Sequence, residues 1–326
     1  MDIEEIVALS VKHNVSDLHL CSGSPPRWRQ HGNLTAAPFE QPDISALLSG
    51  QLTSLQQQQW RESRQVDFAL TTASGRRLRA GAFARHGGIS LALRLLPQRC
   101  PQLSDISAPA ALAELLAREN GLILVTGATG SGKSTTLAAM VQHLNHQAEA
   151  HIVTLEDPIE FVHQSGNSLI QQREIGQHCA SFADGLRAAL RQDPDVILLG
   201  ELRDSETIRL ALTAAETGHL VLATLHTRGA AQAVERLVDS FPAQEKEPVR
   251  SQLAGSLQAV LAQRLEVDKQ GGRVALFELL INTPAVANLI REGKTHQLPG
   301  VMQTGQQQGM QTFAQSHQQR VREGRL

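Results

Sequence analysis

The chain has 326 residues, of which 41% are apolar and only 3% aromatic, and its formal net charge is −2. This length predicts about two domains with a sizeable apolar core. Sequence-independent binding of nucleic acid is disfavoured, because neutralising phosphates and stacking bases require basic and aromatic side chains in excess.

The first 97 residues predict a small α+β domain. The elements expected here are, in chain order, a helix that stops near Asn14, a strand over 17–20, a glutamine-rich helix over 46–61, and paired strands over 78–83 and 89–95 around Gly87 and Gly88. A proline-bearing linker over 98–110 should follow. We therefore expect the first domain boundary at this linker.

Residues 111–283 alternate between short apolar runs and helical segments, after a first helix that begins near Ala110. The apolar runs are residues 122–125, 152–155, 196–199 and 220–225. Runs of this kind are typical of a buried parallel sheet, so this domain is predicted to be α/β. Residues 284–326 are predicted to form a helical C-terminal region.

A phosphate-binding loop follows the first of these strands. The residues expected to bind nucleotide are Gly127, Ala128, Thr129, Gly130, Ser131, Gly132, Lys133, Ser134 and Thr135, which complete the pattern G-x-x-x-x-G-K-[ST] between a strand and a helix. Backbone N–H groups and the helix start would cradle the phosphates. Lys133 would reach the β- and γ-phosphates and Ser134 would hold Mg²⁺. The chain is therefore predicted to bind a nucleoside triphosphate.

Two of the predicted strands end in carboxylates. Glu201 follows the apolar run 196–199, and Glu160 lies in the acidic segment 154–160. Because parallel strands end at the edge of the sheet where ligands bind, Glu160 or Glu201 is expected to prepare the attacking water, and Glu201 also to help hold Mg²⁺. The alternative interpretation is a pair of solvated acidic strand ends.

Two histidines bracket the strand over 220–225. His219 and His226 are seven positions apart, so their side chains should lie on opposite faces and should not bind one metal ion together. Each could instead polarise a phosphate or contact a neighbouring group. Before them, Gly218 is expected to end a helix that begins near Asp204.

Several motifs over almost the whole chain resemble those of the secretion and type IV pilus ATPases. They are the acidic box 156–160, the run 190–204, the segment 207–219 and Leu225-His226-Thr227. Segments 16–20 and 288–294 resemble the PilT retraction-motor branch in particular. The resemblance implies a PAS-like first domain on a RecA-like ATPase core, ATP bound between them, and a homo-oligomeric ring, usually a hexamer, that moves an inner-membrane pilus platform.

The resemblance also implies roles for individual residues. Glu160 corresponds to the catalytic glutamate of the acidic box, Glu201 to the Walker B glutamate, His219 and His226 to the histidine-box pair, and Arg79 and Arg94 to the arginines that reach the phosphates. A guanidinium can neutralise charge that develops on a phosphoryl group in transfer. The implied reaction is hydrolysis of ATP to ADP and phosphate with Mg²⁺.

The chain departs from the branch at three places. Gly81 stands where an asparagine is usual, and an arginine that is usual near the position of Gly87 is missing. Ala287 replaces an arginine in a signature associated with retraction, so the direction in which the motor works stays open. The tetracysteine zinc insertion of the assembly-type ATPases is missing. Two other functions remain alternatives: a nucleotide-binding accessory ring subunit and a RecA-like DNA translocase, which would be stimulated by DNA.

Cysteine content and the terminal sequence bear on the compartment. Cys21, Cys100 and Cys179 are too far apart for a metal pair and are odd in number, which favours a reducing environment. The acidic start 2–5 differs from a signal peptide, and no apolar run approaches the roughly 18 residues of a spanning helix. We expect a cytoplasmic protein without direct membrane insertion, peripheral at the inner membrane only through a partner.

Overall fold

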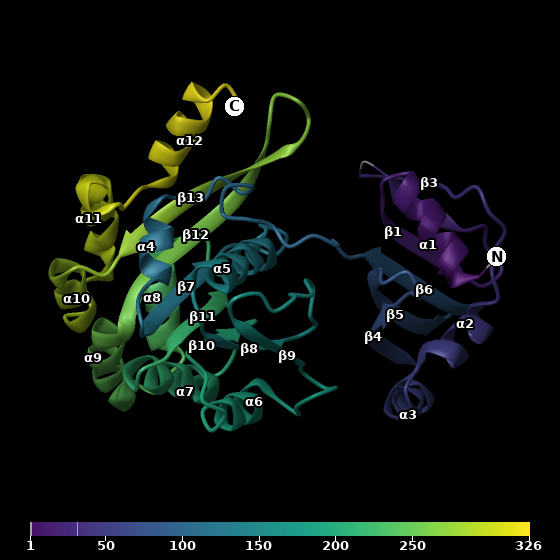
Figure 1. The fold of residues 1–326 in the computed structure, drawn as a ribbon, viewed down its shortest axis with the longest axis horizontal. Coiled ribbons are helices and arrows are strands. Elements are labelled where there is room, and N and C mark those ends of the chain that lie inside the picture. Colours follow the sequence, from purple (N-terminus) through teal and green to yellow (C-terminus); the bar gives the residue numbers. More distant parts are fainter. Residues whose placement is uncertain (1, 31) are drawn as a thin grey trace. The chain divides into compact units, whose positions relative to one another are not determined.

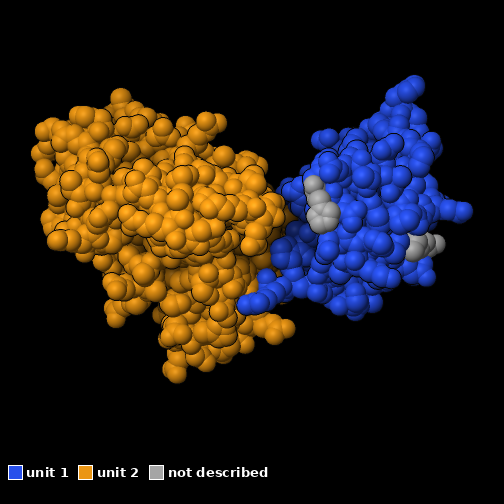
Figure 2. Space-filling model, turned by 90° about the horizontal axis from the view of Figure 1, so that it is seen from above, with its two compact units in different colours: residues 1–99 blue, residues 100–326 orange. Residues whose placement is uncertain are grey.

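A computed structural model describes residues 2–30 and 32–326 and divides the chain into two compact units (Figures 1 and 2). Unit 1 is Met1–Arg99 and unit 2 is Cys100–Leu326. The predicted linker 98–110 overlaps this boundary, and its residues from Cys100 onward group with unit 2, where Leu103 and Ile106 pack on the apolar core. The C-terminal segment 284–326 belongs to the same unit.

Unit 1 is an antiparallel sheet with three helices. Its elements are α1 (Ile3–Lys12), β1 (Val15–Cys21), β2 (Arg27–Gln30), β3 (Asn33–Ala36), α2 (Ile44–Gln51), α3 (Ser54–Ser63), β4 (Gln65–Thr71), β5 (Arg77–Arg85) and β6 (Gly88–Leu95). The strand order is β3-β2-β1-β6-β5-β4. The predicted hairpin is confirmed, because Leu78 lies opposite Leu95 and Phe83 opposite Ser90.

The prediction of a single helix over 46–61 is wrong. Leu52 is extended, and Thr53 begins a new helix by accepting a hydrogen bond from the Gln56 N–H while the Gln56 side chain accepts from the Thr53 N–H. This capping box satisfies two backbone donors at the start of α3 and so favours a helix start there. The sequence therefore forms α2 and α3 in place of one helix.

Unit 2 contains a second sheet with helices between its strands. Its first elements are α4 (Ala111–Leu116), β7 (Gly121–Thr126), α5 (Lys133–Gln147), β8 (His151–Glu156), β9 (Leu169–Glu174), α6 (Phe182–Ala189), β10 (Val196–Leu199), α7 (Ser205–Glu216), β11 (Leu220–Leu225) and α8 (Ala230–Asp239). The remaining elements are α9 (Lys246–Ser256), β12 (Leu257–Val267), β13 (Arg273–Ile281), α10 (Pro284–Arg291), α11 (Leu298–Thr304) and α12 (Phe313–Arg322), with 3₁₀ turns at Ala243–Glu245, Thr295–Gln297 and Gly305–Gln308.

The sheet of unit 2 is parallel except at one edge. Its order is β13-β12-β7-β11-β10-β8-β9, with β12 and β13 forming an antiparallel hairpin (Figure 1). Every residue of β7, β10 and β11 is buried, as a sheet covered on both faces requires. The predicted parallel sheet is confirmed. Because β7, β8, β10 and β11 are mutually parallel, their carboxyl ends share one edge.

The C-terminal helices pack onto unit 2. Helix α12 lies along β13 (Figure 1), and its buried Arg320 donates to the carbonyl of Ser107 at 2.6 Å and to that of Ala275 at 3.3 Å. Ala287, on α10, is buried in the same core. In the part of the chain that the structure describes, the helices are all too short or too polar to traverse a bilayer.

Candidate nucleotide-binding and hydrolysis site

The phosphate loop connects β7 to α5 through glycines with positive φ. Gly130 has φ 79° and Gly132 has φ 91°, which favour glycine. A Cβ added at Gly127 would lie 2.4 Å from Ser131 Oγ and 2.5 Å from the Gln263 carbonyl oxygen. Helix α5 begins at Lys133, and no side chain caps it, so its first backbone N–H groups are available to donate hydrogen bonds to an anion.

Lys133 lies across the loop that it follows. Its Nζ donates to the carbonyl of Gly127 at 2.8 Å and to that of Ala128 at 3.1 Å. Partial burial lowers the pKa of Lys133, although the nearby carboxylates of Glu201 and Glu160 act to raise it. The two acids predicted from strand ends therefore lie within electrostatic reach of the phosphate-loop lysine.

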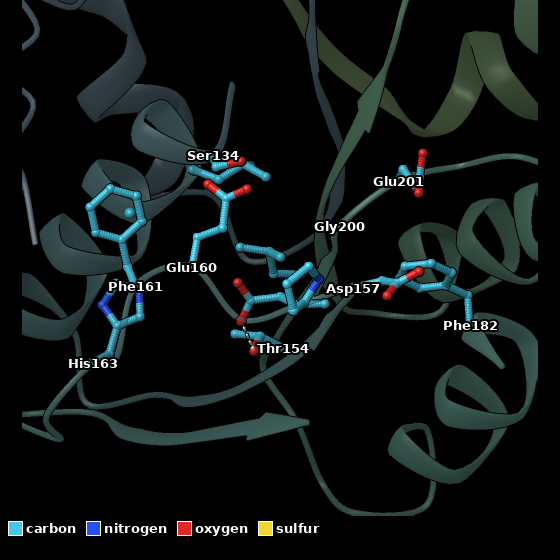
Figure 3. A pocket seen from close by; sticks show the side chains of 14 residues that line it. Ser134, Thr154, Asp157, Glu160, Phe161, His163, Phe182, Gly200 and Glu201 are labelled. Carbon is cyan, nitrogen blue, oxygen red and sulfur yellow. Dashed lines mark hydrogen bonds between the residues drawn. The ribbon is translucent and has the colours of Figure 1, made fainter. Parts of the chain in front are cut away.

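One cavity unites the loop with both acids. Ser134, Glu160 and Glu201 line the same partly open hollow, in which the space between atoms, including space open to solvent, is about 560 Å³. Figure 3 shows the Glu160 side chain extending toward Ser134, with Glu201 on the other side of the cavity. The remaining lining residues are Leu137, Ala138, Thr154, Glu156, Asp157, Pro158, Phe161, His163, Phe182, Leu198 and Gly200.

Glu201 follows β10, and its carboxylate interacts with an arginine and a histidine. Arg203 pairs with Glu201 Oε1, and His226 Nε2 donates to Glu201 Oε2 at 3.2 Å. Partial burial acts to raise the pKa of Glu201, but the hydrogen bonds from Arg203 and then His226 outweigh it and the pKa lies below its usual value. Thr224 on β11 also donates to the carbonyl of Gly200, which ties the two strand ends together. Glu201 is therefore kept ionised.

The structure separates the two histidines. His226 follows the carboxyl end of β11 and contacts Glu201, whereas His219 precedes the amino end of the same strand. The carbonyl of His219 accepts from the N–H of Gly121, the first residue of β7. His219 therefore lies at the opposite edge of the sheet from the phosphate loop, and of these two histidines it is His226 that contacts a residue of the site.

The two predicted arginines lie in unit 1. Arg79 on β5 and Arg94 on β6 are opposite each other in the sheet, and both are exposed. The Arg94 Nε donates to Asp17 Oδ1 at 2.7 Å. Partial burial acts to raise the pKa of Asp17, but hydrogen bonds from Ser16 and then Arg94 lower it below its usual value. The ionised Asp17 carboxylate therefore orients the Arg94 side chain on the surface of the sheet.

Two side chains that support the phosphate loop were not predicted. Gln263 on β12 is 2% exposed, and its Nε2 donates to the Ser131 carbonyl at 2.6 Å. Thr126 Oγ1 donates to the Thr227 carbonyl at 2.6 Å and so joins β7 to the residue after His226. Gln263 carries no local signal, because 132 positions separate it from its partner.

The donor set suits a magnesium ion carried in with a nucleotide. Within residues 2–30 and 32–326, His, Cys, Asp and Glu do not gather in threes as a protein-only metal site would require. Mg²⁺ is commonly held by one or two protein oxygens together with phosphates and waters. Ser134 and Glu201 line the cavity with such oxygens, and both Glu201 oxygens already accept hydrogen bonds, which favours contact through water.

Comparison with known proteins shows the family of the chain. The family model described as type II/IV secretion system protein matches residues 2–270. The chain is 74% identical over 326 residues to the uncharacterized protein YggR of Escherichia coli K12, with all of both chains covered. It is 46% identical over 316 residues to the type IV pilus retraction ATPase PilT of Pseudomonas aeruginosa, covering 96% of this chain and 92% of the other.

A solved structure extends the likeness to the fold. The crystal structure of the pilus retraction motor PilT with bound ADP superposes with a TM-score of 0.92 at 43% identity, covering 100% of this chain and 94% of that one. The expected combination of a RecA-like core with a small α+β domain before it is thus confirmed. The chain belongs to the type II/IV secretion system protein family, a family of ATPases, and it is PilT-like along its whole length.

Proposed function

We propose that the chain is an ATP-hydrolysing motor subunit of the PilT kind. The observation that carries this proposal is the convergence of Ser134, Glu160 and Glu201 on one cavity beside Lys133. A motor needs turnover as well as binding, and two carboxylates beside a phosphate loop supply a base or water-orienting group. Similarity to a retraction ATPase and to an ADP-bound motor supports the same function.

The proposed reaction is in-line attack of water on the γ-phosphate. The loop N–H groups and Lys133 would hold the phosphates, and Ser134 and Glu201 would hold Mg²⁺, which would supply positive charge there. Glu160 or Glu201 orients and deprotonates the water. His226 acts through Glu201, with which it shares a hydrogen bond. Donors and cations aimed at the γ-phosphate stabilise the charge that develops on it in the transition state.

The mechanical part of the proposal involves unit 1. Arg79 and Arg94 would close on the phosphates and stabilise charge in the transition state, and their release would move unit 1 relative to unit 2. A ligand that binds one arrangement better than the other drives such a change. We further propose a hexameric cytoplasmic ring that acts on an inner-membrane pilus or secretion platform. In this ring His219 would contact a group outside the nucleotide site of its own subunit.

Phosphate release by purified protein tests the proposal. Wild-type protein with ATP and Mg²⁺ should turn over, Lys133→Ala should lose turnover, and Glu201→Gln should bind ATP without hydrolysing it. Undiminished phosphate release from either variant would contradict the site. Light scattering with and without nucleotide should report a six-subunit mass, and a monomer under all conditions would contradict the ring.

Two further measurements separate the motor from its alternatives. A DNA translocase should hydrolyse ATP faster when DNA is added, whereas the motor should not. An accessory subunit should show no turnover with or without the membrane platform. If turnover appears and DNA leaves it unchanged, both alternatives fail.

A further inference from the structure

The residues on either side of Glu160 are both held by side chains of the neighbouring strand β9. The N–H of Ile159 donates to Glu174 Oε2 at 3.0 Å. The carbonyl of Phe161 accepts from Gln172 Nε2 at 2.8 Å. We propose that Gln172 and Glu174 are positioning residues for Glu160, an inference that rests on the proposed role of Glu160 in hydrolysis.

Gln172 makes three contacts to the segment 156–163, which contains Glu160. Besides Phe161, its Nε2 donates to Glu156 Oε2 at 3.0 Å, and its Oε1 accepts from the N–H of His163 at 2.8 Å. An amide is suited to this position because it offers donors and an acceptor on one planar group. A carboxylate would lose both donations, and an aliphatic side chain would lose all three contacts.

Glu174 contributes from the same face of the strand. Positions 172 and 174 are two residues apart, so their side chains leave β9 on one side. The Glu174 side chain is buried at 4% exposure, and its Oε1 accepts from Gln177 Nε2 at 2.6 Å. The carboxylate that holds Ile159 is therefore itself held in place.

Such support matters because Glu160 lies outside regular structure. No helix or strand includes residues 157–168, which connect β8 to β9 within the described chain. A catalytic carboxylate must be held within a fraction of an ångström of its productive position, and a misplacement of about 1 Å can cost about 10²-fold in rate. The nucleotide, by contrast, would be bound by the loop between β7 and α5. Loss of the β9 contacts should therefore slow the chemical step and spare binding.

The first test compares two glutamines of one strand. Gln172→Leu should lower kcat by about 10- to 100-fold with KM for ATP changed less than about twofold. Gln171→Leu is the matched control, because Gln171 is exposed and its Oε1 contacts His151 Nε2 at 3.0 Å, away from the acidic segment. It should retain wild-type kcat. Equal kcat for the two variants would overturn the proposal.

A second variant covers the case in which Gln172→Leu does not fold. Gln172→Glu preserves size and the acceptor for His163 but removes both donations and places a second carboxylate beside Glu156. It should also lower kcat with little change in KM. Wild-type kcat in a folded Gln172→Glu protein, judged by its melting temperature and ATP binding, would likewise overturn the proposal.

A double variant distinguishes positioning of Glu160 from general support. If Gln172 acts through Glu160, Gln172→Leu should have no further effect on kcat in a Glu160→Gln background, because interacting sites are not additive. The same fold-loss in both backgrounds would overturn the proposal while leaving the proposed function intact. Full turnover by Glu160→Gln alone would leave Glu201 to activate the water, and would overturn this inference without contradicting the proposed function. No turnover by the wild type would contradict the proposed function itself.

Discussion

His226 Nε2 donates to Glu201 Oε2 at 3.2 Å, and this bond joins the residue after β11 to the carboxylate after β10. The two positions are 25 residues apart in the chain but meet at the sheet edge that also carries the phosphate loop. Together with Arg203, His226 stabilises the ionised form of Glu201. The pH dependence of hydrolysis should therefore report on these two neighbours.

Removing either neighbour of Glu201 should move the acidic limb of the rate profile to higher pH. The pKa of Glu201 is depressed in the folded protein, so the ionised form persists as the pH falls and is lost only below the ordinary carboxyl range. Arg203→Ala should raise that pKa more than His226→Ala, because Arg203 contributes the larger stabilisation. The measurement is kcat against pH, with exposed His146→Ala as control. Acidic limbs that coincide in all four proteins would contradict it.

Substitutions at two phosphate-loop glycines should differ in severity. Gly127→Ala places a methyl group 2.4 Å from Ser131 Oγ and 2.5 Å from the Gln263 carbonyl, so ATP binding should be lost. At Gly130 a Cβ meets nothing within 4 Å, and the cost is the left-handed backbone alone, about 1–2 kcal/mol. Titration with a fluorescent ATP analogue checks the order. Tighter binding by Gly127→Ala than by Gly130→Ala would contradict it.

Gln263→Leu should weaken ATP binding without contacting ATP. The change keeps the volume but removes the donor to the buried Ser131 carbonyl, at a cost of about 1–3 kcal/mol. If half of this cost falls on the bound state, the Kd for ATP rises by up to about tenfold. Calorimetry of ATP binding measures it, and Gln318→Leu, exposed on α12, serves as control. An unchanged Kd together with an unchanged melting temperature would show that the hydrogen bond from Gln263 to the Ser131 carbonyl contributes nothing to ATP binding or to stability.

His163 should make the protein less stable in mild acid. Burial lowers its pKa from 6.5 to about 4, and its Nδ1 has no hydrogen-bond partner in the described part of the chain. Between these pH values the unfolded state binds the proton and the folded state does not, so stability falls as the pH falls, by about 3 kcal/mol at most. The melting temperature of His163→Gln should fall less than that of the wild type between pH 6.5 and 4. Parallel curves for the two proteins would be inconsistent with a neutral, partly buried His163.

The elements fixed by local patterns could be predicted well from the sequence. The phosphate loop, the parallel strands and helix α7, which lies between Asp204 and Gly218, all depend on spacing within one segment. The acids Glu160 and Glu201 line the predicted cavity, because each lies in a segment that leaves the carboxyl end of a buried parallel strand. The prediction of one helix over 46–61 was wrong because the capping box at Thr53 starts a new helix within an otherwise continuous helical pattern.

The sequence by itself determined a phosphate loop, two strand-end acids and an α/β sheet, because these follow from periodicity and from chain direction. Only the tertiary structure decided which residues share the site. It joins His226 to Glu201 and leaves His219 at the far edge of the sheet, and it places Gln263 and Gln172 against loops distant in sequence. Such contacts depend on strand order and register, which no short stretch of sequence contains.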